Sequence, residues 1–163
     1  MHPSARKVAE VLQALGVETE VVEFSQSTRT AQDAAAAIGT TVGQIVKSLL
    51  FLADGKPVLA LVSGQHRLDT QKLGRAAGAS QVERADADTV RAVTGYVIGG
   101  VPPVGHDRPL PVFMDRDLLQ YDVVYAAAGT PQAVFAIAPA RLQEITGAQV
   151  VDLAAPPEQR AAA

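Results

Sequence analysis

Hydrophobic and polar positions along the chain follow two different spacings, and each spacing predicts one kind of element. Apolar residues three or four positions apart indicate a helix face, whereas short continuous or alternating apolar runs indicate strands. The first spacing predicts helices at Ser4–Leu15, Ala31–Ile38, Leu68–Ala76, Asp86–Thr94 and Pro139–Thr146, with a turn or short helix at Arg116–Gln120. The second predicts strands at Thr19–Phe24, Ile45–Leu52, Pro57–Val62, Gln81–Arg84, Pro111–Met114, Val123–Ala128, Ala133–Ala138 and Gln149–Leu153.

Turn signals between these elements indicate how they connect. Asp54-Gly55 is a strong hairpin signal between two expected strands. Gly129–Gln132 separates two further apolar runs at hairpin spacing. The resulting order is mostly hairpins interleaved with helices rather than strict βαβ alternation. We therefore predict an α+β fold built on a mixed, largely antiparallel sheet.

The length and composition fit one folded unit. The chain has 163 residues, of which 48% are hydrophobic and 19% charged, so it can form a core. We expect a single domain over residues 1–153 and a flexible C-terminal tail over 154–163. The apolar stretches fall well short of the ~20 residues of a membrane span, and the N-terminus lacks an apolar signal core. These features favour a cytoplasmic protein without membrane contact.

Composition also excludes several chemistries. There is no cysteine, which rules out disulfides, thiolate zinc sites and a thiol nucleophile. The three histidines, His2, His66 and His106, are scattered without an HExxH pattern, so we expect no metal and no cofactor. The net charge of −3 argues against a protein that grips long nucleic acid, so any such contact should be small or assisted by a partner.

The segment Tyr96–Gly105 is the strongest local signal for a site. Its glycines let another molecule approach the main chain, and Pro102 and Pro103 stiffen the segment that follows. Exposed amides in such a loop can cradle a carbonyl oxygen, a carboxylate or a phosphate. An ordinary connection between strands has the same composition, so both interpretations stay open.

Two further residues allow a functional and a purely structural interpretation. Lys47 interrupts the apolar run Ile45–Leu52, so its ammonium must reach water, a carboxylate or a ligand. A lysine at the sheet edge that extends to solvent would satisfy the same pattern. Thr30 starts the expected helix Ala31–Ile38, and the free amides of that helix end either serve only the cap or face a ligand.

Several motifs in order resemble the YbaK/ProX-type (YbaK/EbsC) family, the free-standing relatives of the editing domain inserted in bacterial prolyl-tRNA synthetases. The resemblance extends from about Arg29 to Leu153. The matching segments are Val46–Leu49, Ser63–Asp69, Thr94–Tyr96 with Gly99–Gly105, Tyr121-Asp122, and Ala126–Pro131 with Ala133–Phe135.

This resemblance implies a fold, an activity and a set of site residues. The fold would be a mixed, barrel-like sheet with surrounding helices. The activity would be hydrolysis of the ester between tRNA, most often tRNA(Pro), and a small mischarged amino acid: Ala, Cys, Ser or Thr. The partners would be the acceptor end of aminoacyl-tRNA and a prolyl-tRNA synthetase, with the oligomeric state left open. The catalytic positions would be Lys47, Gly99, Gly100 and Val101, and the substrate-binding positions Thr30, Ser48, Pro102, Pro103, Gly129 and Thr130.

Two positions depart from the family pattern. Pro102 stands where relatives often have Ser, which removes a hydroxyl and an amide donor. Thr130 stands where relatives vary, often with His, Ser or Asn. Two alternatives therefore stay open: a non-catalytic module that binds an aminoacyl-tRNA end or a small amino acid, and a protein associated with a synthetase.

Overall fold

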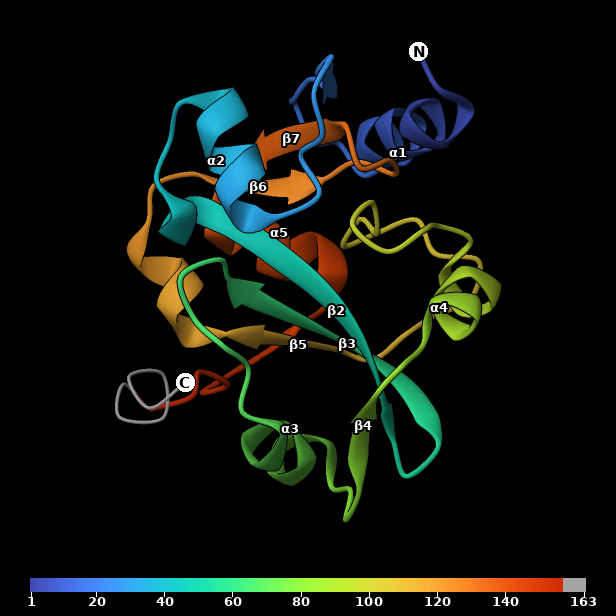
Figure 1. Ribbon diagram of the computed structural model, residues 1–163, viewed down its shortest axis with the longest axis vertical. Coiled ribbons are helices and arrows are strands. Elements are labelled where there is room, and N and C mark those ends of the chain that lie inside the picture. The colour runs from blue at the N-terminus through green and yellow to red at the C-terminus, as the bar shows by residue number, and fades with distance from the viewer. Residues whose placement is uncertain (157–163) are drawn as a thin grey trace.

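A mixed sheet organised around one long strand forms the centre of the protein. The computed structural model describes residues 1–156. Strand β2 (Ile45–Ala53) crosses the middle of the molecule (Figure 1) and pairs along its length with antiparallel β3 (Lys56–Ser63). On its other edge, parallel β6 (Val124–Ala127) pairs with the start of β2, and antiparallel β4 (Val82–Arg84) pairs with its end. The Asp54-Gly55 turn thus forms the predicted hairpin.

The remaining strands extend the sheet on both sides. They are β1 (Val22–Glu23), β5 (Val112–Asp115), β7 (Ala133–Ile137) and β8 (Gln149–Val151). The order is β1-β7-β6-β2-β3-β5-β8, with β4 attached to β2. This arrangement confirms the α+β class and the mixed sheet. The barrel-like expectation needs a correction, because β1 and β8 stand at opposite ends of the strand order and the sheet over residues 1–156 is open.

Alternation along β2 separates two hydrophobic cores. Val46 and Leu50 face a core that includes side chains of α1 (Pro3–Ala14), α4 (Ala87–Thr94) and α5 (Pro139–Thr146). Phe51 and Ala53 face the opposite core, which includes Leu73 of α3 (Thr70–Ala77). Helix α2 (Ala31–Ile38) packs against Ile45 in a third, smaller cluster. Short 3₁₀ helices occupy Val42–Gln44 and Arg116–Gln120.

Capping groups explain where the helices begin. The Thr30 hydroxyl accepts a hydrogen bond from the Asp33 amide at 3.0 Å, as the sequence predicted. Helix α3 begins later than expected, because the Asp69 carboxylate accepts from the Gln71 amide at 2.9 Å and makes Asp69 the cap. The strand expected at Thr19–Phe24 is wrong in length, since β1 pairs with β7 only through Val22 and Glu23.

The sequence predicts a flexible tail from residue 154, but the first two residues of that segment are packed against the fold. Ala154 and Ala155 are both buried. Ala154 forms a bridge with Leu68, and the Ala155 amide donates to the Arg67 carbonyl at 2.8 Å. The packed part of the chain therefore continues past Leu153, and the part of the expected tail at 157–163 lies outside the described residues. None of the helices within residues 1–156 is long and apolar enough to cross a membrane.

Candidate functional site

The outer edge of β2 lacks a neighbouring strand at Ser48. The Gly64 amide donates to the Ile45 carbonyl at 2.7 Å, which places the main-chain groups of Ile45 toward β3. Because these groups alternate along an antiparallel strand, those of Ser48 point to the opposite edge. On that edge β2 pairs with β6 only as far as Val46, and its pairing with β4 begins only at Phe51. Within residues 1–156, the sheet therefore has an opening beside Ser48.

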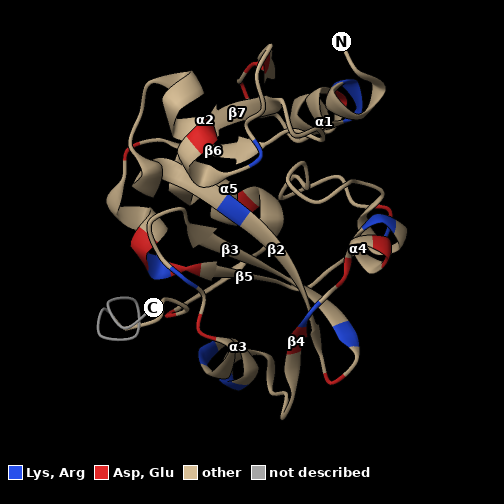
Figure 2. Ribbon diagram, viewed as in Figure 1, with Lys and Arg blue, Asp and Glu red and all other residues tan. Residues whose placement is uncertain are grey.

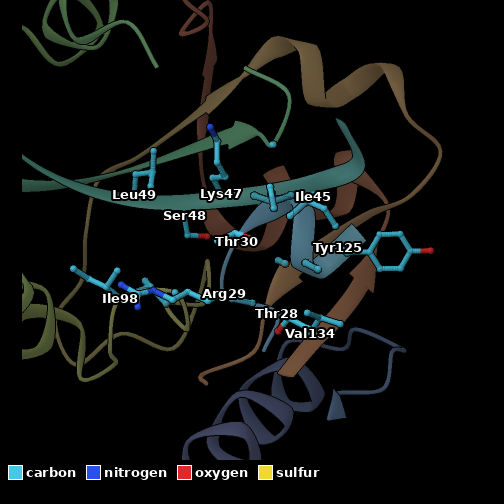
Figure 3. A pocket seen from close by; sticks show the side chains of 18 of the residues that line it. Thr28, Arg29, Thr30, Ile45, Lys47, Ser48, Leu49, Ile98, Tyr125 and Val134 are labelled. Carbon is cyan, nitrogen blue, oxygen red and sulfur yellow. The ribbon is translucent and has the colours of Figure 1, made fainter. Parts of the chain in front are cut away.

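A cavity of about 400 Å³ lies along this opening. It is bordered by the start of α2, by β6 and β7, by the residues around the start of α4, and by the glycine-proline loop. In Figure 3 the side chains of Ser48 and Thr30 point into the same space, and that of Arg29 extends toward Ile98. The opening in the sheet therefore combines an apolar space with polar groups at its border.

The cavity brings together half of the site residues expected from the sequence. Those that line it are Thr30, Lys47, Ser48, Gly99 and Val101. Those outside its lining are Gly100, Pro102, Pro103, Gly129 and Thr130. Of the second group, Gly100, Pro102 and Pro103 belong to the same loop as Gly99 and Val101, and the turn at Gly129 and Thr130 packs against Gly100.

Gly100 holds the loop against the turn that follows β6. Its carbonyl accepts a hydrogen bond from the Gly129 amide at 2.9 Å. A Cβ atom at Gly100 would lie 2.7 Å from the carbonyl carbon of Thr130, so only glycine fits this approach. The Gly100 amide donates to the Val97 carbonyl at 3.0 Å. The Gly100 amide is therefore already bonded within the loop, and the amides of Gly99 and Val101 remain candidates for the predicted cradle.

The two prolines are buried supports of this loop. The Nε2 atom of His106 lies 2.7 Å from the Pro102 carbonyl oxygen. A carbonyl can only accept, so Nε2 carries the proton and donates to it. Burial lowers the pKa of His106, although the hydrogen bond to Pro102 opposes that shift. The departure from serine at Pro102 therefore falls behind the cavity wall rather than on it.

Lys47 borders the cavity, but its ammonium lies on the other side of β2. Its side chain points to the side of β2 opposite Ser48 (Figure 3), and Nζ donates to the His66 carbonyl. Burial lowers the pKa of Lys47 below the ordinary lysine value, and the nearby guanidinium groups of Arg84 and Arg67 lower it further. The Lys47 ammonium is thus partly buried and bonded to a main-chain carbonyl, rather than paired with a carboxylate or fully solvated.

Three basic residues border the cavity, although the chain as a whole is acidic. Arg29, Lys47 and Arg84 line it, and its lining within residues 1–156 contains no carboxylate. Lys47 supplies the basic position in the middle of β2 in Figure 2. In the described part of the chain, these three cations form no ion pair with an acidic side chain. Such cations favour an anionic group of a ligand, but the ammonium of Lys47 and the side chain of Arg84, which pairs with Phe51, lie on the side of β2 away from Ser48.

Sequence reasoning did not select Arg29 or Arg84. The sequence pattern around each of them indicates only an ordinary surface arginine. Their position at the cavity follows from the packing of α2 and β4 beside β2. One signal was present for Arg29: the glycine at position 99 leaves room for it. A Cβ atom on Gly99 would lie 2.4 Å from Arg29 Cγ. Arg29 therefore covers the loop glycine at the mouth of the cavity.

The neighbouring Ser63, His66 and Asp69 have separate structural roles. The Ser63 hydroxyl donates to the Gly43 carbonyl at 2.7 Å, and His66 Nε2 lies 3.1 Å from Asp117 Oδ2. Asp69 caps α3. They do not form a catalytic triad. Within residues 1–156, no group of three His, Cys, Asp or Glu side chains is arranged to hold a metal ion.

Comparison with known proteins assigns the family. Residues 25–145 match the profile of the family described as the aminoacyl-tRNA editing domain. This match covers well over half of the chain and contains every residue named above as lining the cavity. The chain belongs to the aminoacyl-tRNA editing domain family, which confirms the resemblance inferred from its motifs.

Individual relatives agree with this assignment. A solved structure described as "a putative trans-editing enzyme for prolyl tRNA synthetase" superposes with a TM-score of 0.91 at 50% identity, covering 96% of this chain and 99% of the other. The Enterococcus faecalis protein named "Putative Cys-tRNA(Pro)/Cys-tRNA(Cys) deacylase EbsC" is 28% identical over 131 residues, or 80% of each chain. Proline--tRNA ligase of Nitratidesulfovibrio vulgaris is 40% identical over 89 residues, which are 55% of this chain and 16% of the ligase.

Proposed function

We propose that this protein is a trans-editing deacylase that hydrolyses the ester of a small mischarged amino acid, Ala, Cys, Ser or Thr, on tRNA, with tRNA(Pro) as the preferred carrier. The observation that carries this proposal is the cavity beside Ser48, where an opening in the sheet meets a glycine loop, a helix start and unpaired cations. Membership of the editing family supplies the reaction class.

The shape of the cavity supports a small side chain. Its apolar walls include Val101, Ala126 and Val134, and its volume of about 400 Å³ must also receive the terminal ribose. A synthetase disfavours an amino acid smaller by one methylene by only ~1–3 kcal/mol, so a second site that admits small side chains is needed to remove the error.

The two sides of β2 suggest how the substrate is divided. The aminoacyl group occupies the cavity on the Ser48 side, where the amides of Gly99 and Val101 are candidates to bind the acyl carbonyl as it gains negative charge. Lys47 and Arg84 stand toward the terminal ribose and its phosphate, because both are cations without a carboxylate partner. Thr30 lines the pocket, and Thr130 acts from outside the lining, where its main chain packs against Gly100 of the loop.

In this proposed arrangement of the substrate, no side chain of the protein acts as the nucleophile. The chain has no cysteine, and Ser63 is buried and bonded to the Gly43 carbonyl. Water, aided by the substrate's own side chain or by a hydroxyl of the terminal ribose, would then attack the ester. The chain's residues bind and orient the ester and stabilise developing charge.

The partners follow from the charge distribution. Three of the fourteen Lys and Arg residues border the cavity, while the net charge of the chain is −3. Such a surface suits contact with the acceptor end alone. A prolyl-tRNA synthetase would hold the rest of the tRNA.

Single-turnover deacylation of Ala-, Cys-, Ser-, Thr- and Pro-tRNA(Pro) tests the proposal. We expect cleavage of one or more small aminoacyl esters with Pro-tRNA(Pro) spared. Folded protein that cleaves none of them, with or without a prolyl-tRNA synthetase, would contradict the enzyme and favour the binding module. In that case saturable binding of the aminoacyl end should persist without turnover.

A further inference from the structure

A buried hydroxyl without a partner marks the opening in the sheet. The Oγ atom of Ser48 is buried and has no hydrogen-bond partner among the described residues. Leaving a buried hydroxyl unpaired is costly, which makes this atom unusual in a well-packed strand. Ser48 lines the cavity, and its side chain points into it (Figure 3). The atom is therefore placed to serve a ligand rather than the fold.

The main chain of Ser48 faces the same opening. The Ala85 amide donates to the Leu50 carbonyl at 3.1 Å, which confirms that alternate residues of β2 direct their main-chain groups to this edge. Val46 uses the edge for β6, whereas Ser48 has no strand opposite it within residues 1–156. One amide N–H, one carbonyl oxygen and one hydroxyl of a single residue thus converge on the cavity.

We propose that this edge recognises the free α-amino group of the aminoacyl ester, with Ser48 as the residue that reads it. This inference rests on the proposed function and names the part of the substrate that Ser48 binds. An aminoacyl group is one residue of a peptide, so it can pair with Ser48 as one residue of an added strand. Its α-amine donates to the carbonyl oxygen and the hydroxyl of Ser48, and its acyl carbonyl accepts from the Ser48 amide.

The lining of the cavity within residues 1–156 holds no carboxylate, so the amine meets no acidic side chain there. The carbonyl oxygen and the hydroxyl of Ser48 are the acceptors that its opening offers. The amine has at least two protons to donate to them in either protonation state. Because this contact reads a group common to all amino acids, side-chain selection falls to the apolar walls.

The test compares two stable analogues that differ only in the amine: 3′-alanylamino-3′-deoxyadenosine and 3′-propionylamino-3′-deoxyadenosine. Binding of each is measured by calorimetry to wild type, Ser48→Ala and Ser48→Thr, with Ser80→Ala as a control at a serine distant from the cavity. We expect wild type and Ser80→Ala to prefer the alanyl analogue by about tenfold or more. Ser48→Ala should reduce this preference severalfold, and Ser48→Thr, which keeps a hydroxyl, should restore it.

An alanyl preference that is absent in wild type, or that is unchanged in folded Ser48→Ala, would overturn the assignment. So would a Ser48→Ala effect confined to a seryl analogue, since the hydroxyl would then read the side chain. Binding is independent of turnover. A protein that binds as expected yet cleaves no aminoacyl-tRNA would contradict the proposed enzyme while retaining the amine site.

Discussion

Strand β2 has a paired half, Phe51–Ala53, and an open half at Lys47 and Ser48. Phe51–Ala53 pairs with β3 on one edge and β4 on the other, and the side chains of Phe51 and Ala53 pack into the core beside α3. At Lys47 and Ser48 the strand pairs only with β3, and the other edge borders the cavity. An interrupted ladder therefore lets one rigid strand supply both the framework of the sheet and a border of the cavity.

The paired half should carry the stability of the fold. Phe51 is 4% exposed, so Phe51→Ala would leave a cavity in a packed core. We expect a loss of about 3–5 kcal/mol in the free energy of unfolding. Ser48→Ala in the open half should cost less than about 1 kcal/mol, because its hydroxyl bonds no described residue. Urea unfolding measures both, and equal losses would remove the distinction between the halves.

The open half should carry the activity. Lys47→Ala should reduce single-turnover deacylation by about 10²–10³-fold, the effect typical of removing one preorganised group that stabilises charge. Lys72→Ala is the matched control, because Lys72 pairs with Asp152 at 2.9 Å and does not line the cavity. Full deacylase activity in folded Lys47→Ala would exclude a role for this lysine.

The loop behind the cavity should be sensitive to added volume. Gly100→Ala would place Cβ 2.7 Å from the Thr130 main chain, so the loop and the turn must separate. We expect a loss of about 1–3 kcal/mol in stability and a fall in activity of tenfold or more.

Gly55→Ala provides the contrast at the paired end of β2. There a Cβ meets no atom within 4 Å, although the positive φ of +80° carries its own strain. It should lower stability by about 1–2 kcal/mol and leave activity intact. Equal activity losses in the two variants would argue against a specific role for the Gly100 contact.

The lowered pKa of Lys47 predicts a pH effect. Burial disfavours the ammonium, so Lys47 loses its proton at a lower pH than an ordinary lysine. Enzymatic deacylation, corrected for spontaneous ester loss, should therefore fall on the alkaline side below the ordinary lysine range. Lys47→Arg, whose guanidinium stays charged, should lose this fall whatever its absolute rate. An identical profile in both proteins would assign the titration to another group.

The smallest expected effect concerns His106. Its pKa is lowered by burial, so between the folded and unfolded pKa values the unfolded chain binds more protons. The stabilisation from the neutral ring is fully present above the unfolded pKa and is lost as the pH falls below it. Urea unfolding from pH 8 to pH 5 should show a shallower decline for His106→Gln than for wild type. A steeper decline in the variant would contradict the buried neutral ring.

Local chemistry made much of the fold predictable. Hydrophobic periodicity located the helices and most strands, and caps such as Thr30 and Asp86 set two helix starts. The length of β1 was not predictable, because its pairing depends on the position of β7. Closure of the sheet was not predictable either, since it depends on which strands stand at the two ends.

The candidate site was predictable as a set of motifs and not as a geometry. Lys47, Gly99 and Thr30 were identified before their proximity was known, and they line one cavity. The opening beside Ser48 depends on where β6 and β4 stop along β2, which no local pattern reports. The hydrogen bond from the Gly100 amide to the Val97 carbonyl was not predictable either, because it depends on the conformation of the loop.

The central claim, that the aminoacyl end binds at the open half of β2, is tested most directly by backbone amide NMR shifts. Titration with 3′-alanylamino-3′-deoxyadenosine should shift the amides of Ser48, Gly99 and Val101 and leave those of Phe51–Ala53 unchanged. Saturable binding with no shift at Ser48 or the loop, or with shifts centred on β4 and α3, would place the ligand elsewhere and contradict the account.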